Sequence, residues 1–187
     1  MNLNFLGDAL DFWKGCLFNR LTSADLLQDL KVESLLTDHQ AWQEPDFALY
    51  AELLEVGRQA IDPPDERAGD LFLDPDIGVQ TSRVSVANRV KYVTPSKVAH
   101  LANASPRHVV AVYQHVRGRQ VLDRVSAVVA TLQRVEPGLS LCSVESGTVA
   151  MVFTSRDAER VAHIYQHFHR LFRNTVPYRT HLWPVVG

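Results

Sequence analysis

The chain has 187 residues, of which 46% are hydrophobic and 21% charged, and this is the composition of an ordinary globular protein. Its formal charge of −2 is the sum of three segments that differ in charge. Residues 1–82 carry 5 basic and 16 acidic side chains, residues 83–124 carry 8 basic and 1 acidic, and residues 125–187 carry 6 basic and 4 acidic. This pattern excludes a uniformly basic nucleic-acid coat protein and a uniformly acidic tail protein.

The first half of the chain predicts two main helices and two strands. Apolar residues recur at three- and four-residue steps from Asp8 to Leu21, which predicts a helix with acidic residues in its first turn. A short helical stretch is expected over 24–30, a strand over 32–36, and a second helix that opens at 45–46 and ends near residue 57. The two prolines within 62–65 predict a surface loop, and the apolar run 71–73 predicts a buried strand that ends in a turn at 74–78.

The second half alternates strands and helices. Residues 79–93 lack a clean period and predict a long mobile loop. Thr94 and Pro95 have the form of an N-cap and a first helical residue, for a helix to about residue 102. A strand is then expected at 109–113, a helix at 121–135, a hairpin from the runs 139–144 and 148–153, and a last helix from residue 155 or 156.

This alternation predicts an α/β fold in which helices cover both faces of a mostly parallel sheet of about five strands, with a closing C-terminal hairpin at one edge. We expect residues 1–173 to form a single domain. Residues 174–187 are expected to be a C-terminal tail that either packs on the domain or hangs free.

Three bulk features narrow the setting of the protein. No stretch approaches the roughly 20 consecutive apolar residues of a membrane span, and the first residues are polar or acidic, so we expect a cytoplasmic protein without membrane contact. Cys16 and Cys142 are far apart and lack CxxC spacing, so no disulfide framework or zinc site is indicated. The phosphate-binding patterns GxGxxG and GxxxxGK[ST] are absent.

Polar residues follow three of the predicted strands: Thr37-Asp38-His39, Asp74-Pro75-Asp76 and Gln114-His115. Ligands of open parallel sheets bind at the carboxyl ends of strands. If the three strands are parallel neighbours, these residues line one crevice.

Asp74 and Asp76 are the leading catalytic candidates. Two carboxylates on a turn are able to hold Mg²⁺ or to accept hydrogen bonds from a ligand's amino or hydroxyl groups. The alternative is that Asp74 caps the turn and Asp76 is solvated. His115 is a candidate acid or base near neutral pH, Gln114 a candidate for positioning a substrate amide or base, and Asp38 a further ligand-binding candidate.

The basic segment 83–124 is a candidate phosphate-binding surface, for nucleic acid or for a phosphate-bearing small molecule. Its phosphate-binding candidates are Arg83, Lys91, Arg117 and Arg119. Tyr92 and Tyr113 lie close enough in sequence to stack a base. The alternative is a solvated surface that pairs with the acidic first half of the chain.

The chain contains three notable runs: Gly7-Asp8-Ala9-Leu10-Asp11-Phe12-Trp13-Lys14-Gly15, Leu71-Phe72-Leu73-Asp74-Pro75-Asp76-Ile77-Gly78 and Tyr113-Gln114-His115. With these runs it resembles a family of uncharacterised bacterial proteins that pair a GDALDxWKG motif with an FLDPDxG motif. More distantly, the chain is similar to Rossmann-like nucleic-acid methyltransferases, such as ribosomal RNA adenine methyltransferases and three-Cys-motif partner proteins. That resemblance implies a three-layer, methyltransferase-like scaffold and a target amine held at the Asp-Pro turn. It also implies ligand-binding roles for Asp11, Lys14 and Gly78. The turn after the first strand, residues 37–42, lacks the glycine that an S-adenosylmethionine site needs.

Three functions remain open from the sequence. The first is a nucleic-acid-directed enzyme on a methyltransferase-like scaffold, with S-adenosylmethionine as cofactor. The second is a Mg²⁺-dependent phosphoesterase or nuclease that uses Asp38, Asp74 and Asp76. The third is a non-catalytic binding module with a degenerate cofactor pocket. Neither cofactor has a complete motif, and oligomeric state, substrate and catalysis itself are not determined by the sequence.

Overall fold

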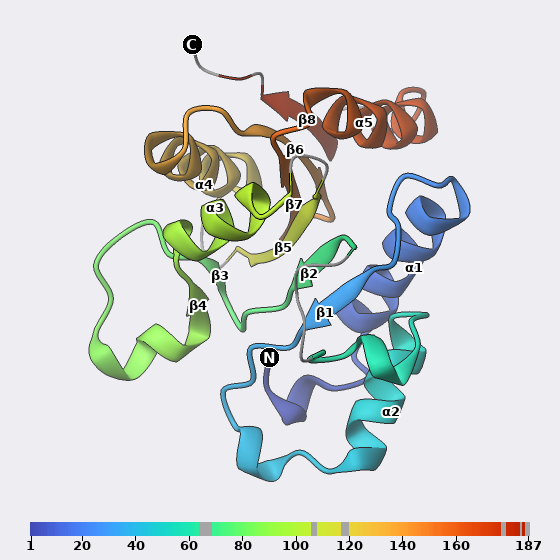
Figure 1. The fold of residues 1–187 in the computed structure, drawn as a ribbon, viewed down its shortest axis with the longest axis vertical. Coiled ribbons are helices and arrows are strands. Elements are labelled where there is room, and N and C mark those ends of the chain that lie inside the picture. Colours follow the sequence, from blue (N-terminus) through green and yellow to red (C-terminus); the bar gives the residue numbers. More distant parts are fainter. Residues whose placement is uncertain (64–68, 106–107, 117–119, 177–178, 184, 186–187) are drawn as a thin grey trace.

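The structure is a computed structural model that describes residues 1–63, 69–105, 108–116, 120–176, 179–183 and 185 (Figure 1). Within these residues the chain forms five α-helices and eight strands. The helices are α1 (Ala9–Ser23), α2 (Glu44–Leu53), α3 (Pro95–Asn103), α4 (Val121–Val135) and α5 (Ala158–Phe172). The strands are β1 (Lys31–Glu33), β2 (Leu71–Leu73), β3 (Gly78–Val79), β4 (Tyr92–Val93), β5 (Val110–His115), β6 (Ser140–Glu145), β7 (Val149–Ser155) and β8 (Thr180–Trp183).

The central sheet has the strand order β1-β2-β5-β7-β6-β8. Strands β1, β2 and β5 are parallel, whereas β7 pairs antiparallel with both β5 and β6, and β8 pairs antiparallel with β6. The prediction of a mostly parallel sheet is therefore wrong, because the sheet is mixed; its six strands are close to the expected number of about five. The predicted hairpin, β6 and β7, lies between β5 and β8 and not at one edge of the sheet. The physical reason is that a hairpin is antiparallel by construction, and here its second strand is inserted against β5.

Helices cover both faces of the sheet (Figure 1), as the alternation of elements predicted. One apolar cluster joins α1, α2 and α5 to one face, with Phe18, Tyr50 and Phe168 among its largest fully buried side chains. A second cluster joins α3 and α4 to the other face, around the buried strand residues Leu71 and Val110. The result is three layers, helix, sheet and helix, with the core divided by the sheet.

The helix boundaries follow local chemistry. Asp8 is the N-cap of α1, and its carboxylate accepts hydrogen bonds from the backbone of Leu10 and Asp11 at 2.7 and 3.2 Å. Thr94 caps α3 ahead of Pro95, as predicted. In α1, a Cβ on Gly15 would lie 2.0 Å from the carbonyl oxygen of Leu53, so glycine is what lets α1 approach the end of α2.

Three predicted segments differ from the structure or are refined by it. Residues 24–30 form turns instead of a helix, with Asp25 and Asp29 at φ values of 56° and 48°. The expected loop 79–93 contains a short parallel ladder of β3 and β4 and a 3₁₀ helix, Val86–Lys91. In the C-terminal segment, for which packing and a free tail were both open, residues 180–183 pack as β8 on β6.

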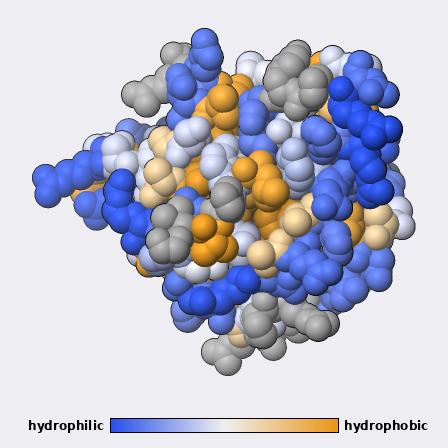
Figure 2. Space-filling view, turned by 90° about the horizontal axis from the view of Figure 1, so that it is seen from above, coloured by the Kyte–Doolittle hydropathy of each residue, from blue (hydrophilic) through white to orange (hydrophobic). Residues whose placement is uncertain are grey.

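The outer surface is mixed in character. Among the described residues, no helix has the length and apolar content needed to cross a membrane. The view over α4, α5 and β8 in Figure 2 shows apolar side chains gathered near the middle of that face, with hydrophilic ones around them. Exposed apolar residues of these elements include Leu122, Val135, Leu171 and Leu182.

Candidate functional site

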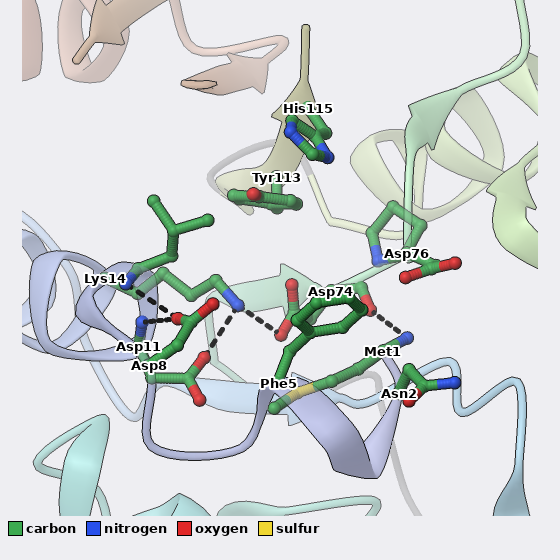
Figure 3. A pocket seen from close by; sticks show the side chains of 12 residues that line it. Met1, Asn2, Phe5, Asp8, Asp11, Lys14, Asp74, Asp76, Tyr113 and His115 are labelled. Atoms are coloured by element: carbon green, nitrogen blue, oxygen red, sulfur yellow. Dashed lines mark hydrogen bonds and ion pairs between the residues drawn. The ribbon is translucent and has the colours of Figure 1, made fainter. Parts of the chain in front are cut away.

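A cavity of about 130 Å³ lies beside the turn that follows β2 (Figure 3). The turn 74–76, the N-terminal segment with the first turns of α1, and the end of β5 provide its walls. Its lining residues are Met1, Asn2, Phe5, Asp8, Leu10, Asp11, Lys14, Asp74, Pro75, Asp76, Tyr113 and His115. The predicted candidates Asp74, Asp76, His115, Asp11 and Lys14 are thus brought together around one cavity.

Lys14 lies at the centre of a buried charge cluster. Its Nζ is 2.8 Å from Oδ2 of Asp74 and 3.0 Å from Oδ1 of Asp11, and the three side chains are at most 5% exposed. Asp11 and Lys14 stand three residues apart on α1, which places them on the same helix face. Burial by itself disfavours the ammonium, but the carboxylates of Asp74 and Asp11 outweigh it and raise the pKa of Lys14.

Asp11 is also tied to the backbone. Its Oδ2 accepts a hydrogen bond of 2.9 Å from the amide of Gly7, so both of its oxygens are engaged. Burial raises the pKa of the Asp11 carboxyl against the opposing effect of Lys14. Asp11 therefore positions Lys14 and the N-terminal turn, and it has little capacity left for a ligand.

Asp74 has one oxygen engaged and one that faces the cavity. Its Oδ2 accepts hydrogen bonds from Lys14 and from the hydroxyl of Tyr50. Burial, with the nearby Asp74 charge, raises the pKa of Tyr50 well above its usual value, so this phenol remains a donor. No described residue donates to Oδ1 of Asp74, and Figure 3 shows this oxygen pointing toward the ring of Tyr113. The free oxygen is an acceptor in a fixed position.

Three rings, those of Phe5, Tyr113 and His115, form part of the wall. Lys14 Nζ lies 4.6 Å from the ring centroid of Tyr113, and the rings of Tyr113 and His115 are 6.4 Å apart (Figure 3). Burial, with Asp74 the next contribution, raises the pKa of Tyr113, which keeps its hydroxyl protonated. Phe5, on the N-terminal segment, is 52% exposed and lines the mouth. A planar group entering the cavity would meet these rings.

The charges of the lining favour a cation or a hydrogen-bond donor. Four carboxylates, those of Asp8, Asp11, Asp74 and Asp76, face two cations, the ammonium of Lys14 and the α-ammonium of Met1. Asp8 is committed to capping α1, and Asp76 has no side-chain hydrogen bond to another described residue. The cavity itself is therefore acidic and does not attract a phosphate.

Other candidates have structural contacts instead. Asp38 accepts hydrogen bonds of 3.0 Å from the amide of Leu3 and from the indole of Trp42, and it does not line the cavity. Gln114 is fully buried and holds the segment after the Asp74 turn in place. Its side chain accepts a hydrogen bond of 3.0 Å from the amide of Val79 and donates one of 2.9 Å to the carbonyl of Ile77. Gly78 has φ 131°, and a Cβ there would lie 2.2 Å from Gln114 Oε1.

The phosphate-binding candidates lie away from the cavity or outside the residues that the structure describes. Arg83 is exposed and Lys91 half-buried, both on the segment between β3 and β4. Arg117 and Arg119 lie outside the described residues. Neither Arg83 nor Lys91 lines the cavity.

Sequence reasoning missed Tyr50, Asp8 and Phe5 as members of the site. Tyr50 fell on the apolar stripe of a helix and Asp8 in a first turn, so both had a sufficient local explanation. The one available signal was the hydroxyl of Tyr50, because a tyrosine that is completely buried usually has a hydrogen-bond partner. Which partner it has depends on the approach of α2 to β2.

The site does not fit S-adenosylmethionine. The end of β1, where the cofactor of a methyltransferase would be held, is covered by residues 1–3: Met1 N donates to the carbonyl of Leu35 at 2.8 Å and Thr37 N to that of Met1 at 2.9 Å. Leu35, not glycine, has the positive φ of 45° in this turn. A cavity of about 130 Å³ is also well below the roughly 300–1,000 Å³ of sites for drug-sized ligands.

The site does not fit a Mg²⁺ centre either. Among the described residues, no three His, Cys, Asp or Glu side chains are placed to hold a metal ion together. The ammonium of Lys14 stands 2.8 Å from Asp74, where a cation bound to Oδ2 would have to lie. Asp38, the third ligand of the metal hypothesis, is engaged elsewhere.

No family model matches the chain, and no curated protein does so either. The function is therefore inferred from the chemistry and geometry of the site.

Proposed function

We propose that the protein is a binding module for single-stranded nucleic acid that holds an unpaired base, amine edge first, in the cavity at Asp74. The observation that carries this proposal is the free Oδ1 of Asp74, fixed by the contacts of Oδ2 with Lys14 and Tyr50 and facing an aromatic wall. A buried carboxylate acceptor suits the exocyclic amines of adenine and cytosine. Bases of single strands stack on aromatic side chains.

The size of the cavity supports one ring system in preference to a whole nucleotide or a cofactor. About 130 Å³ accommodates a base while its sugar and phosphate remain outside, where the acidic lining does not repel them. The Asp-Pro turn after β2 and the terminal hairpin support descent from a Rossmann-like, methyltransferase-like scaffold. The covered end of β1 favours the binding module over the methyltransferase, and the ammonium beside Asp74 favours it over a Mg²⁺ phosphoesterase.

The test is fluorescence anisotropy with labelled 12-residue oligonucleotides of adenine, cytosine or thymine. The adenine and cytosine strands should bind more tightly than the thymine strand, because thymine has no exocyclic amine. Phe5→Ala should weaken binding of the adenine strand by roughly tenfold, since stacking contributes about 1–3 kcal/mol per base. Phe12→Ala is the matched control: Phe12 is 61% exposed on α1 and does not line the cavity.

Two results would overturn the proposal. One is the absence of binding of any of the three strands by the wild-type protein. The other is an equal loss in Phe5→Ala and Phe12→Ala, which would place the contact outside the cavity. Asp74→Asn, checked for folding by its thermal melt, should remove the preference for adenine and cytosine over thymine.

A further inference from the structure

A second cavity of about 490 Å³ lies between the segment 77–92 and α4. Arg124 and Arg134 contribute from α4, and Thr81, Ser82 and Tyr92 from the segment. The helix face that forms the floor also carries Ala127 and Ala130, whose short side chains leave the space open. We call this cavity the α4 groove.

The α4 groove is basic where the Asp74 cavity is acidic. Among the described residues its lining contains two arginines and no carboxylate. Arg134 is exposed and takes part in no ion pair with another described residue. Arg124 donates to the carbonyl of Val79 at 2.9 Å and to the hydroxyl of Thr81, two neutral oxygens that hold its guanidinium at the groove. Such a lining suits an anion.

The spacing of the arginines suits a chain of anions. They stand ten residues apart on one helix, which corresponds to roughly 15 Å along its axis at about 1.5 Å per residue. Each nucleotide of a stacked strand advances about 3.4 Å along the strand axis, so the α4 groove spans several phosphates. The hydroxyls of Thr81 and Ser82 are further donors of the kind that contact phosphate oxygens, whereas that of Thr131 donates to the carbonyl of Ala127.

The two cavities are neighbours along the backbone. Pro75 and Asp76 line the Asp74 cavity, and the next residue, Ile77, lines the α4 groove. The amide of Gln114 holds this wall in place through Ile77 and Val79. A ligand with an amine-bearing base and an attached phosphate chain thus matches the acidic cavity on one side and the basic groove on the other.

We propose that the α4 groove binds the phosphodiester backbone of the single strand whose base enters the Asp74 cavity; this rests on the proposed function. Arg124 and Arg134 are then the phosphate contacts. Of the candidates first singled out from the sequence, Arg83 and Lys91 do not line this groove, and Arg117 and Arg119 lie outside the described residues. The pattern that identifies the groove is the face of α4 on which Arg124, Thr131 and Arg134 recur.

The test compares Arg134→Ala with Arg170→Ala by anisotropy over a range of salt concentrations. Both arginines are exposed and lie in the last turn of a helix, so the loss of a favourable helix-dipole interaction is matched. The probes are a 12-residue adenine strand and an abasic strand of the same length. Arg134→Ala should weaken binding of both strands about threefold or more and reduce the slope of log K against log salt by about 0.7. Arg170→Ala should change neither.

The abasic strand separates the two proposals. Phe5→Ala should leave its binding unchanged, because no base is present. If Arg134→Ala weakens both strands while Phe5→Ala weakens neither, the α4 groove stands and the base cavity falls. An unchanged salt slope in Arg134→Ala, or equal changes in both arginine variants, overturns the α4 groove. So does displacement of the abasic strand by inorganic phosphate at constant ionic strength, which would mark a small-anion site.

Discussion

Asp74 combines a structural and a binding role in one side chain. One oxygen anchors the ammonium of Lys14 and the hydroxyl of Tyr50, and the other remains available to a ligand. The cost of burying this carboxylate is offset by the opposite charge of Lys14 and by the two hydrogen bonds. The ion pair thereby gives a buried acceptor a fixed direction.

Removal of the lysine should be strongly destabilising. Lys14→Met leaves two buried carboxylates without their counter-charge, which costs about 3–5 kcal/mol when one partner of a buried pair is lost. Urea unfolding measures this loss as a lower midpoint at similar slope. Lys31→Met, which leaves the 62%-exposed carboxylate of Asp29 without its partner, is the control and should cost at most about 1 kcal/mol. Similar losses in the two variants would show that the buried cluster contributes no more than a surface pair.

His108 should make stability sensitive to acid. It is 3% exposed, and neither ring nitrogen has a hydrogen-bond partner among the described residues. Burial lowers its pKa below 6.5, so the unfolded chain binds the proton more readily than the folded one. The folded state therefore keeps its full stability with respect to His108 above pH 6.5. This part of the free energy of unfolding is lost as the pH falls through 6.5 toward the lowered pKa of the folded state.

The measurement is the free energy of unfolding at pH 7.5 and 5.5. The decrease between the two should be smaller in His108→Gln than in the wild-type protein. His100→Gln, at an exposed histidine of α3, should behave as wild type. An equal decrease in all three proteins would rule out His108 as the titrating group.

At the scale of the elements, local signals predicted helices better than they predicted strand partners. The caps Asp8 and Thr94 and the periodicity of α4 are carried by a few neighbouring residues, so their helices follow from the sequence. Residues 24–30 have apolar residues at helical spacing but form turns. Asp70 explains part of this difference, because its Oδ2 accepts the amide of Gln28 at 2.7 Å and holds the segment against β2.

The packing of α1 on α2 depends on Gly15. Gly15→Ala puts a methyl group 2.0 Å from a backbone oxygen, so one helix has to move, and we expect destabilisation of about 1–3 kcal/mol by urea unfolding. Gly138→Ala is the control, because the nearest atom is the end of the Arg156 side chain at 3.0 Å, which can move. If the two variants unfold at the same urea concentration, α1 and α2 are less closely packed than described.

At the scale of the whole molecule, the charge asymmetry of the chain becomes two neighbouring cavities of opposite charge. The acidic first segment supplies all four carboxylates of the Asp74 cavity, and the basic segment with the start of the last one supplies the arginines of the α4 groove. A neutral ligand would gain little from this arrangement. A ligand with a donor edge and an anionic chain matches both.

S-adenosylmethionine should leave the melting temperature unchanged, because residues 1–3 cover the end of β1. A ligand at a hundred times its Kd stabilises a protein by about 2.7 kcal/mol, which amounts to several degrees for a chain of this size. Differential scanning fluorimetry with S-adenosylmethionine and with the adenine strand makes the comparison. If the cofactor raised the melting temperature by several degrees and Asp74→Asn abolished that rise, the methyltransferase hypothesis would be favoured again.

The sequence by itself determined the α/β class, most helix boundaries, the buried strand 71–73 and the polar turn that follows it, because these depend on periodicity, caps and turn residues close together in the chain. The tertiary structure decided the insertion of β7 beside β5, the pairing of β8, and the meeting of Lys14 with Asp74, 60 residues apart. It also decided that Asp38 and Gln114 make hydrogen bonds within the fold and do not line the cavity. Those outcomes depend on how helices and strands pack against one another across the core. A local sequence pattern carries no information about which residue of another element it will contact.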